Sequence, residues 1–155
     1  MSRRKSVQCF SGFPDGKVET VTLPALVFSD LILQIDDLDE LKVTLLVLVR
    51  LTRLRADVAP WVSFDELVKD AEIQAALGER NFEARLESAL ERAVARGTLL
   101  TADRADEEAS AGRRYFANSP KGRAAVAAIR RGATPVRAPA AETRVNIFTL
   151  YEENI

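Results

Sequence analysis

The stretch NFEARLESALERAVARGTLL, residues 81–100, decides the fold class of this chain. Its apolar residues recur every three or four positions, which is the spacing of one face of a helix. These residues are Phe82, Leu86, Ala89, Leu90, Ala93 and Val94. Asn81 stands at the capping position before this run, and Gly97 stands where a left-handed glycine commonly ends a helix. The pattern predicts a helix over 82–96.

The residues after this helix predict a β-hairpin and one more helix. Residues 98–101 and 113–118 have the composition of two short strands, and a polar loop separates them. Ser119 and Pro120 then provide a cap and a proline at the first helical position, so a helix to about Arg131 is expected.

Three capping signals mark helix starts nearer the N-terminus. They are Asp37 with Glu40, Ser63 with Glu66, and Asp70 as an internal restart. The first predicts a helix to about Arg55, and the second a helix to about Leu77. Residues 59–62 interrupt the helical pattern between them.

The segment before the first of these helices predicts one strand and one helix. Residues 17–23 alternate between apolar and polar side chains, which favours a short strand. Pro24 suits the first position of a helix that ends near Ile35.

This order of elements predicts a mainly α fold with a small β-hairpin. Two helices, a short turn and a hairpin are typical of a winged helix-turn-helix, here with an extra N-terminal strand and helix and a C-terminal helix. The expected organisation is a flexible lead (1–16), the winged-helix domain (17–131), an Ala/Pro-rich linker (132–145) and the start of a truncated helical second domain (146–155).

The helix expected over 38–55 is apolar on nearly every side. A helix of this kind is buried on most of its surface, and a subunit interface is one way to cover it in a small domain. We therefore expect a homodimer or a higher oligomer. The candidate self-association residues are Leu41, Leu45, Leu48, Leu51 and Trp61.

Several stretches resemble the N-terminal region of DnaD-like replication initiation proteins, which act in the primosome. They are IDDLDELKVTL at 35–45, with Leu23, Pro24, Phe28 and Leu31 before it, and AVARGTLL at 93–100. NIFTLYEENI at 146–155 resembles the opening of that family's second domain. The resemblance implies a winged-helix domain used for self-association, a scaffold role in helicase loading, and the replicative helicase or other primosome proteins as partners. It also implies that DNA binding resides mostly in a C-terminal domain, so this chain should bind DNA weakly.

A winged-helix transcription regulator that binds duplex DNA is the alternative. The candidate DNA-binding residues are Arg85, Arg92, Arg96, Arg113, Arg114, Lys121 and Arg123. Glu83, Glu87 and Glu91 share the outer face of the 82–96 helix and would repel phosphates, which favours a protein-binding face there. Between residues 113 and 144 there are eight basic residues and one acidic residue. The second strand of the hairpin (the wing) and the last helix therefore have the clearest basic surface for contacting nucleic acid.

Enzymatic function is not expected. The chain has no histidine and a single cysteine, Cys9, so a Cys–His nucleophile is excluded. Residues 12–18 lack the spacing of a phosphate loop, and the acids at 36–40 fit helix capping better than a calcium site. We expect no catalytic residues, no metal and no cofactor. The most apolar stretch, residues 43–49, is too short to cross a bilayer, and a cytoplasmic protein is expected.

Overall fold

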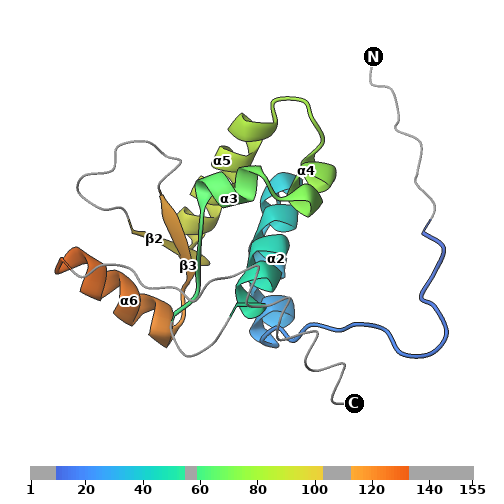
Figure 1. The fold of residues 1–155 in the computed structure, drawn as a ribbon, viewed down its shortest axis with the longest axis horizontal. Coiled ribbons are helices and arrows are strands. Elements are labelled where there is room, and N and C mark those ends of the chain that lie inside the picture. Colours follow the sequence, from blue (N-terminus) through green and yellow to red (C-terminus); the bar gives the residue numbers. More distant parts are fainter. Residues whose placement is uncertain (1–9, 55–58, 103–112, 133–155) are drawn as a thin grey trace, which may run out of the picture.

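The computed structural model describes residues 10–54, 59–102 and 113–132, which form a mainly helical fold with a small antiparallel sheet (Figure 1). The elements are a π-helical turn η1 (Val27–Leu31), α1 (Ile32–Gln34), α2 (Leu38–Thr52), β1 (Trp61–Ser63), α3 (Phe64–Val68), α4 (Ala71–Leu77), α5 (Phe82–Arg96), β2 (Leu99–Ala102), β3 (Arg114–Ala117) and α6 (Pro120–Arg130). The predicted lengths of α5 and α6 are confirmed to within one residue.

The sheet has three strands in the order β1-β3-β2, and all pairs are antiparallel. The predicted hairpin is confirmed, with Leu100 opposite Phe116 and Thr101 opposite Tyr115. β1 was not predicted, since residues 59–62 were interpreted only as a break in the helical pattern. Trp61 pairs with Phe116 across β1 and β3.

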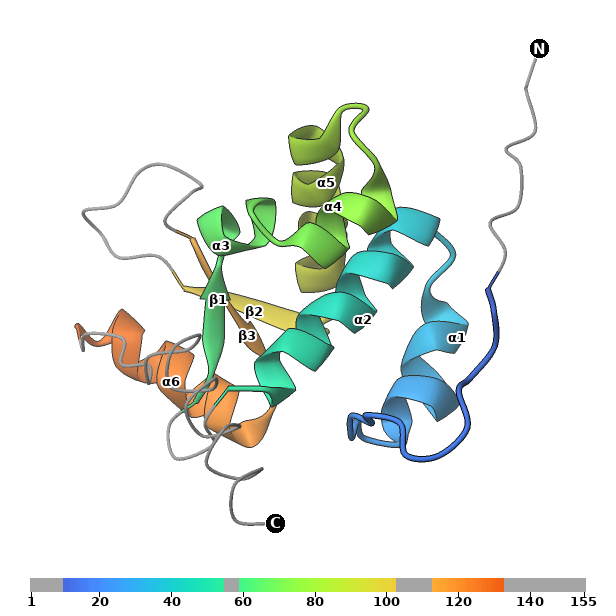
Figure 2. The same cartoon turned by 45° about the vertical axis from the view of Figure 1, so that its right-hand side comes forward.

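The sheet separates two apolar clusters. Because successive side chains of a strand point to opposite faces, neighbours on β3 serve different clusters. Phe116 packs with Val126 and Ile129 of α6. Tyr115 belongs to the main core together with buried residues of α2 and α5. Figure 2 shows α6 on one side of the strands and α2 on the other.

The main core lies between α2 and α5. Val43, Val47 and Leu51 of α2 are buried, as are Leu86 and Leu90 of α5. These positions follow the helical spacing in both segments, so each helix presents one apolar stripe to the other. The π-helical turn and α1 lie outside this pair, beside α2 (Figure 2).

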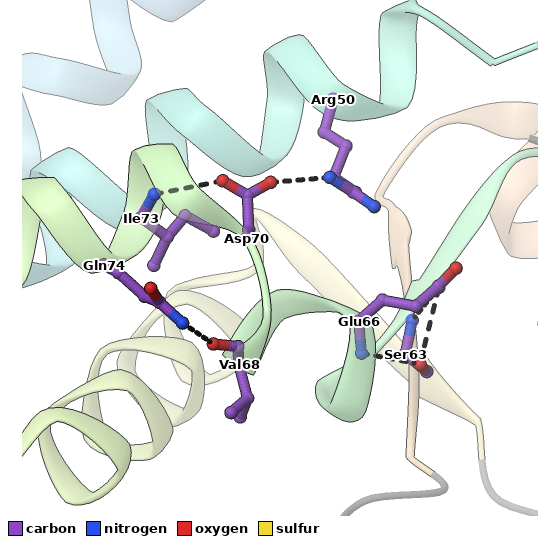
Figure 3. A network of polar contacts seen from close by, with 7 residues as sticks. All are labelled: Arg50, Ser63, Glu66, Val68, Asp70, Ile73 and Gln74. Atoms are coloured by element: carbon purple, nitrogen blue, oxygen red, sulfur yellow. Dashed lines mark hydrogen bonds and ion pairs between the residues drawn. The ribbon is translucent and has the colours of Figure 1, made fainter. Parts of the chain in front are cut away.

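Local capping chemistry fixes where α3 and α4 begin (Figure 3). The Ser63 hydroxyl accepts a hydrogen bond from the Glu66 backbone N–H at 3.1 Å, and the Glu66 carboxylate accepts one from the Ser63 N–H at 2.9 Å. Asp70 accepts from the Ile73 N–H at 3.0 Å and forms an ion pair with Arg50 of α2 at 2.6 Å. The predicted capping box and the restart at Asp70 are therefore confirmed.

Two local predictions are wrong. Residues 17–22 are exposed, Leu23 is half-buried, and the segment forms no strand, because no strand of the described chain lies alongside to accept its backbone hydrogen bonds. Asn81 adopts a left-handed backbone with φ of 52° and its side chain makes no capping bond to α5. The helix predicted from Pro24 to Ile35 is present as η1 followed by α1. Asp37 does cap α2, accepting from the Glu40 N–H at 2.9 Å.

Other expectations fall outside the described residues. They are Cys9 and most of the lead, nearly all of the loop between β2 and β3, the linker after Gly132, and the second-domain start at 146–155. Among the residues that the structure does describe, none of the helices combines the length and the apolar character needed to traverse a bilayer.

Candidate functional site

The large exposed hydrophobic side chains of the described chain all lie in one segment, residues 10–38, which we call the N-terminal arm. They are Phe10, Phe13, Val18, Val21, Leu26, Phe28, Leu33 and Leu38. Leu33 is 75% exposed, Leu26 68% and Phe28 53%. An apolar surface gathered on one segment is typical of an interaction site, whereas single exposed hydrophobic residues are ordinary.

The arm contacts the rest of the fold through few side chains. Val27 is buried, and four other apolar residues of the arm are half-buried: Leu23, Leu31, Ile32 and Ile35. A groove of about 380 Å³ lies between the arm and the body of the domain, and Leu48 of α2 lines it. The turns at 96–98 and 117–119 form its far side. The arm therefore buries a minor part of its apolar surface within this chain.

The self-association candidates predicted on α2 are covered to different degrees. Leu41, Leu45 and Leu48 are half-buried. Leu51 is only 4% exposed and lies in the main core, so its side chain has almost no surface left for a second copy. Trp61 is half-buried against the cluster beneath α6, with the Arg114 guanidinium 5.0 Å from its ring centre. Much of the apolar excess of α2 is thus covered by its own chain.

Two of the predicted DNA-binding arginines form ion pairs inside the domain. Arg85 donates from Nε and Nη2 to the two carboxylate oxygens of Asp39, at 2.8 and 2.7 Å. Arg96 donates in the same two-pronged way to Glu40, at 2.6 and 3.0 Å. Glu40 is completely buried. Both arginines therefore tie α5 to the start of α2.

These ion pairs favour the charged forms of Asp39, Arg85 and Arg96. The hydrogen bond from Arg85 lowers the pKa of Asp39, and the same contact raises the pKa of Arg85. The hydrogen bond with Glu40 raises the pKa of Arg96. An arginine engaged by two oxygens of a carboxylate has few donors left for a DNA base.

We expect the Asp39–Arg85 pair to make stability sensitive to acid. Asp39 has a folded-state pKa below its ordinary value of 3.8, so its contribution is present above that value and is lost as the pH falls through the lower folded pKa. Chemical denaturation of wild type and Asp39→Asn should give a stability difference that is constant near neutral pH and shrinks below about pH 4. A difference that does not change with pH would contradict this assignment.

The outer face of α5 is mostly acidic. Arg92, Glu83 and Glu91 are exposed on this helix, and Glu87 is half-buried. With Arg85 and Arg96 engaged by carboxylates, α5 presents one arginine and three glutamates to solvent. Such a surface would repel the phosphates on both sides of a DNA groove.

The remaining basic candidates lie around the sheet and α6. Arg113 and Arg114 are half-buried at β3, and the Arg113 carbonyl accepts from the Phe64 N–H at 3.0 Å. Lys121 and Arg123 are exposed on α6, and Arg123 donates to the Asn118 side chain at 3.0 Å. The structure therefore does not bring the seven candidates together on one surface.

Arg130 and Arg131 belong to the basic surface predicted for the last helix but are not among the seven predicted DNA-binding candidates. Both are exposed, at and just beyond the end of α6. Arg130 lies seven residues after Arg123, and that spacing returns to the same helix face. Helical spacing in the sequence was a signal that could have included them.

No cluster of three or more histidine, cysteine, aspartate or glutamate side chains suited to a metal ion occurs among the residues that the structure places.

Comparison with known proteins finds no family model, curated protein or solved structure that matches the chain.

Proposed function

We propose that this domain is a self-association module and that the N-terminal arm supplies its interface. The observation that carries the proposal is the confinement of all large exposed hydrophobic side chains, among the described residues, to residues 10–38. Removing one large apolar side chain from water stabilises an assembly by about 1.5–3 kcal/mol. Burying several of them together offsets the cost of association.

A second copy of this chain is the partner that we propose. In a two-fold symmetric dimer each subunit contributes the same surface, so one apolar arm can cover its counterpart without any other protein. The arm is also attached to the body through few contacts and borders a groove lined by Leu48. It can therefore pack against a second domain without opening the α2–α5 core.

We further propose that the domain is a winged helix. The element order helix, strand, helices, strand, strand supports this reading, with α4 and α5 as the helix-turn-helix and β2 and β3 as the wing. The antiparallel order β1-β3-β2 is compatible with it. The resemblance of residues 35–45 and 93–100 to DnaD-like proteins then suggests a scaffold in primosome assembly, with the replicative helicase or other primosome proteins as further partners.

The alternative, a regulator that reads duplex DNA through α5, is less well supported. It requires Arg85, Arg92, Arg96 and the arginines of the wing, Arg113 and Arg114, to act together on DNA. Arg85 and Arg96 are held by Asp39 and Glu40, and freeing Arg96 would leave a buried carboxylate without its partner.

Charged substitutions in the arm test the proposal. We expect the Leu26→Glu/Leu33→Glu variant to weaken association by at least about 100-fold, because two leucines contribute about 3 kcal/mol or more to an interface. Sedimentation equilibrium measures the change. Thermal stability at low concentration should be unchanged, since both side chains are already exposed in the single chain.

Ala84→Glu is the matched control, because it adds a carboxylate to an exposed position of α5 that lies outside the arm. It should associate like the wild type. Equal association of all three proteins, or a wild type that remains a monomer throughout, would contradict the proposal.

A further inference from the structure

The exposed charged side chains of α6 are all basic. Lys121, Arg123, Arg130 and Arg131 are exposed on this helix and at its end, and no acidic residue occurs between residues 118 and 132. We call Arg123, Arg130 and Arg131 the α6 basic face, because helical geometry places these three positions within about 100° of one another and places Lys121 on the other flank of the helix. The side of the helix that packs on the sheet is apolar and includes Val126.

The geometry of this face suits an extended polyanion. An α-helix rises 1.5 Å per residue, so the backbone positions of Arg123 and Arg130 lie about 10.5 Å apart and on the same side. Ala124 and Ala127 are exposed between them, and their short side chains leave the surface open to close approach. Figure 1 shows α6 at the margin of the domain, away from α4 and α5.

Stabilisation of the helix itself does not account for this charge distribution. Cations in the last turn, such as Arg130, interact favourably with the helix dipole. Lys121 and Arg123 lie near the start, where the dipole favours anions instead. The first turns of α2, α3, α4 and α5 all carry an acidic residue, whereas that of α6 carries none.

We propose that the α6 basic face binds the phosphate backbone of nucleic acid without reading the bases. Duplex DNA carries one negative charge per about 1.7 Å of axis, so three arginines spread over this length can neutralise about three phosphates. This assignment is independent of self-association, and it places the DNA contact of the domain on α6 instead of α5.

The test is a titration of a duplex oligonucleotide with the full chain at several salt concentrations. Fluorescence anisotropy measures the binding affinity at each concentration. Each neutralised phosphate contributes about 0.9 to the slope of log affinity against log salt. We expect Arg123→Gln/Arg130→Gln/Arg131→Gln to make that slope shallower by about 2.7. Its mass in sedimentation should equal that of the wild type, which shows that the variant is folded and associates normally.

The matched control is Arg53→Gln/Arg80→Gln/Arg92→Gln, which removes the same charge from exposed positions elsewhere. We expect it to keep a slope close to that of the wild type. An equal decrease of the salt slope in both triple variants would show an effect of net charge and would overturn the proposal. A decrease confined to the control would also overturn it, because it would point to a DNA contact on α5. Absence of binding by the wild type, or equal binding of poly-glutamate, would also overturn it.

Discussion

Arg96→Met should lower the melting temperature by more than about 10 °C, because it leaves a buried charge without its partner. Glu40 is completely buried, and both of its carboxylate oxygens accept hydrogen bonds from Arg96. Arg96 also donates to the Gln34 carbonyl at 2.9 Å, so its loss releases the end of α1 as well. Circular dichroism melts measure the effect.

Substitution of Arg96 and substitution of Glu40 should lower the melting temperature by different amounts. The Arg96 side chain retains 23% exposure, so in Glu40→Leu the guanidinium can turn toward water. We expect a smaller loss for Glu40→Leu than for Arg96→Met, and partial recovery in the double variant, because no buried charge then remains. Arg92→Met, an exposed position of the same helix, should melt close to the wild type. Equal melting of Arg96→Met and Arg92→Met would refute the role of the pair.

Gly122→Ala should destabilise the domain by about 2–3 kcal/mol, although alanine is ordinarily the better helix former by about 1 kcal/mol. A Cβ atom at Gly122 would stand 2.0 Å from the Ala117 carbonyl oxygen. That oxygen belongs to the backbone at the end of β3, so it cannot rotate away. The helix would have to move off the sheet and loosen the contact between Phe116 and Val126.

Urea denaturation measures this loss, and Ala124→Ser provides the control. It adds one atom to the exposed side of the same helix, where a substitution changes stability by no more than about 0.5 kcal/mol. If Gly122→Ala were as stable as the wild type, α6 would not pack as closely against the end of β3 as described.

Features set by neighbouring residues were predictable from the sequence. Asp37, Ser63 and Asp70 cap their helices through bonds to N–H groups three residues away, and Gly97 ends α5 with φ of 97°. β1 was missed because a strand of three residues after a proline has no local signal, and it exists only through pairing with β3. The strand predicted over 17–23 fails for the same reason, since alternation alone provides no partner.

The candidate site was harder to predict because its contacts are remote in sequence. Arg85 and Asp39 are separated by 46 residues, and Arg96 and Glu40 by 56, so nothing in the 82–96 pattern shows that these arginines turn inward. The sequence shows that α2 has more apolar residues than one helix face needs. It does not show that other elements of the same domain cover most of them. Leu51 is an example, because it lies in the main core together with buried residues that are remote from it in the sequence.

Hydroxyl-radical footprinting of the wild-type chain at dilute and concentrated conditions tests most directly whether a second copy covers the arm. The account predicts that oxidation of Phe28 and Leu33 falls as the protein is concentrated, while that of Trp61, outside the arm, stays constant. Unchanged oxidation of Phe28 and Leu33 at every concentration would contradict it.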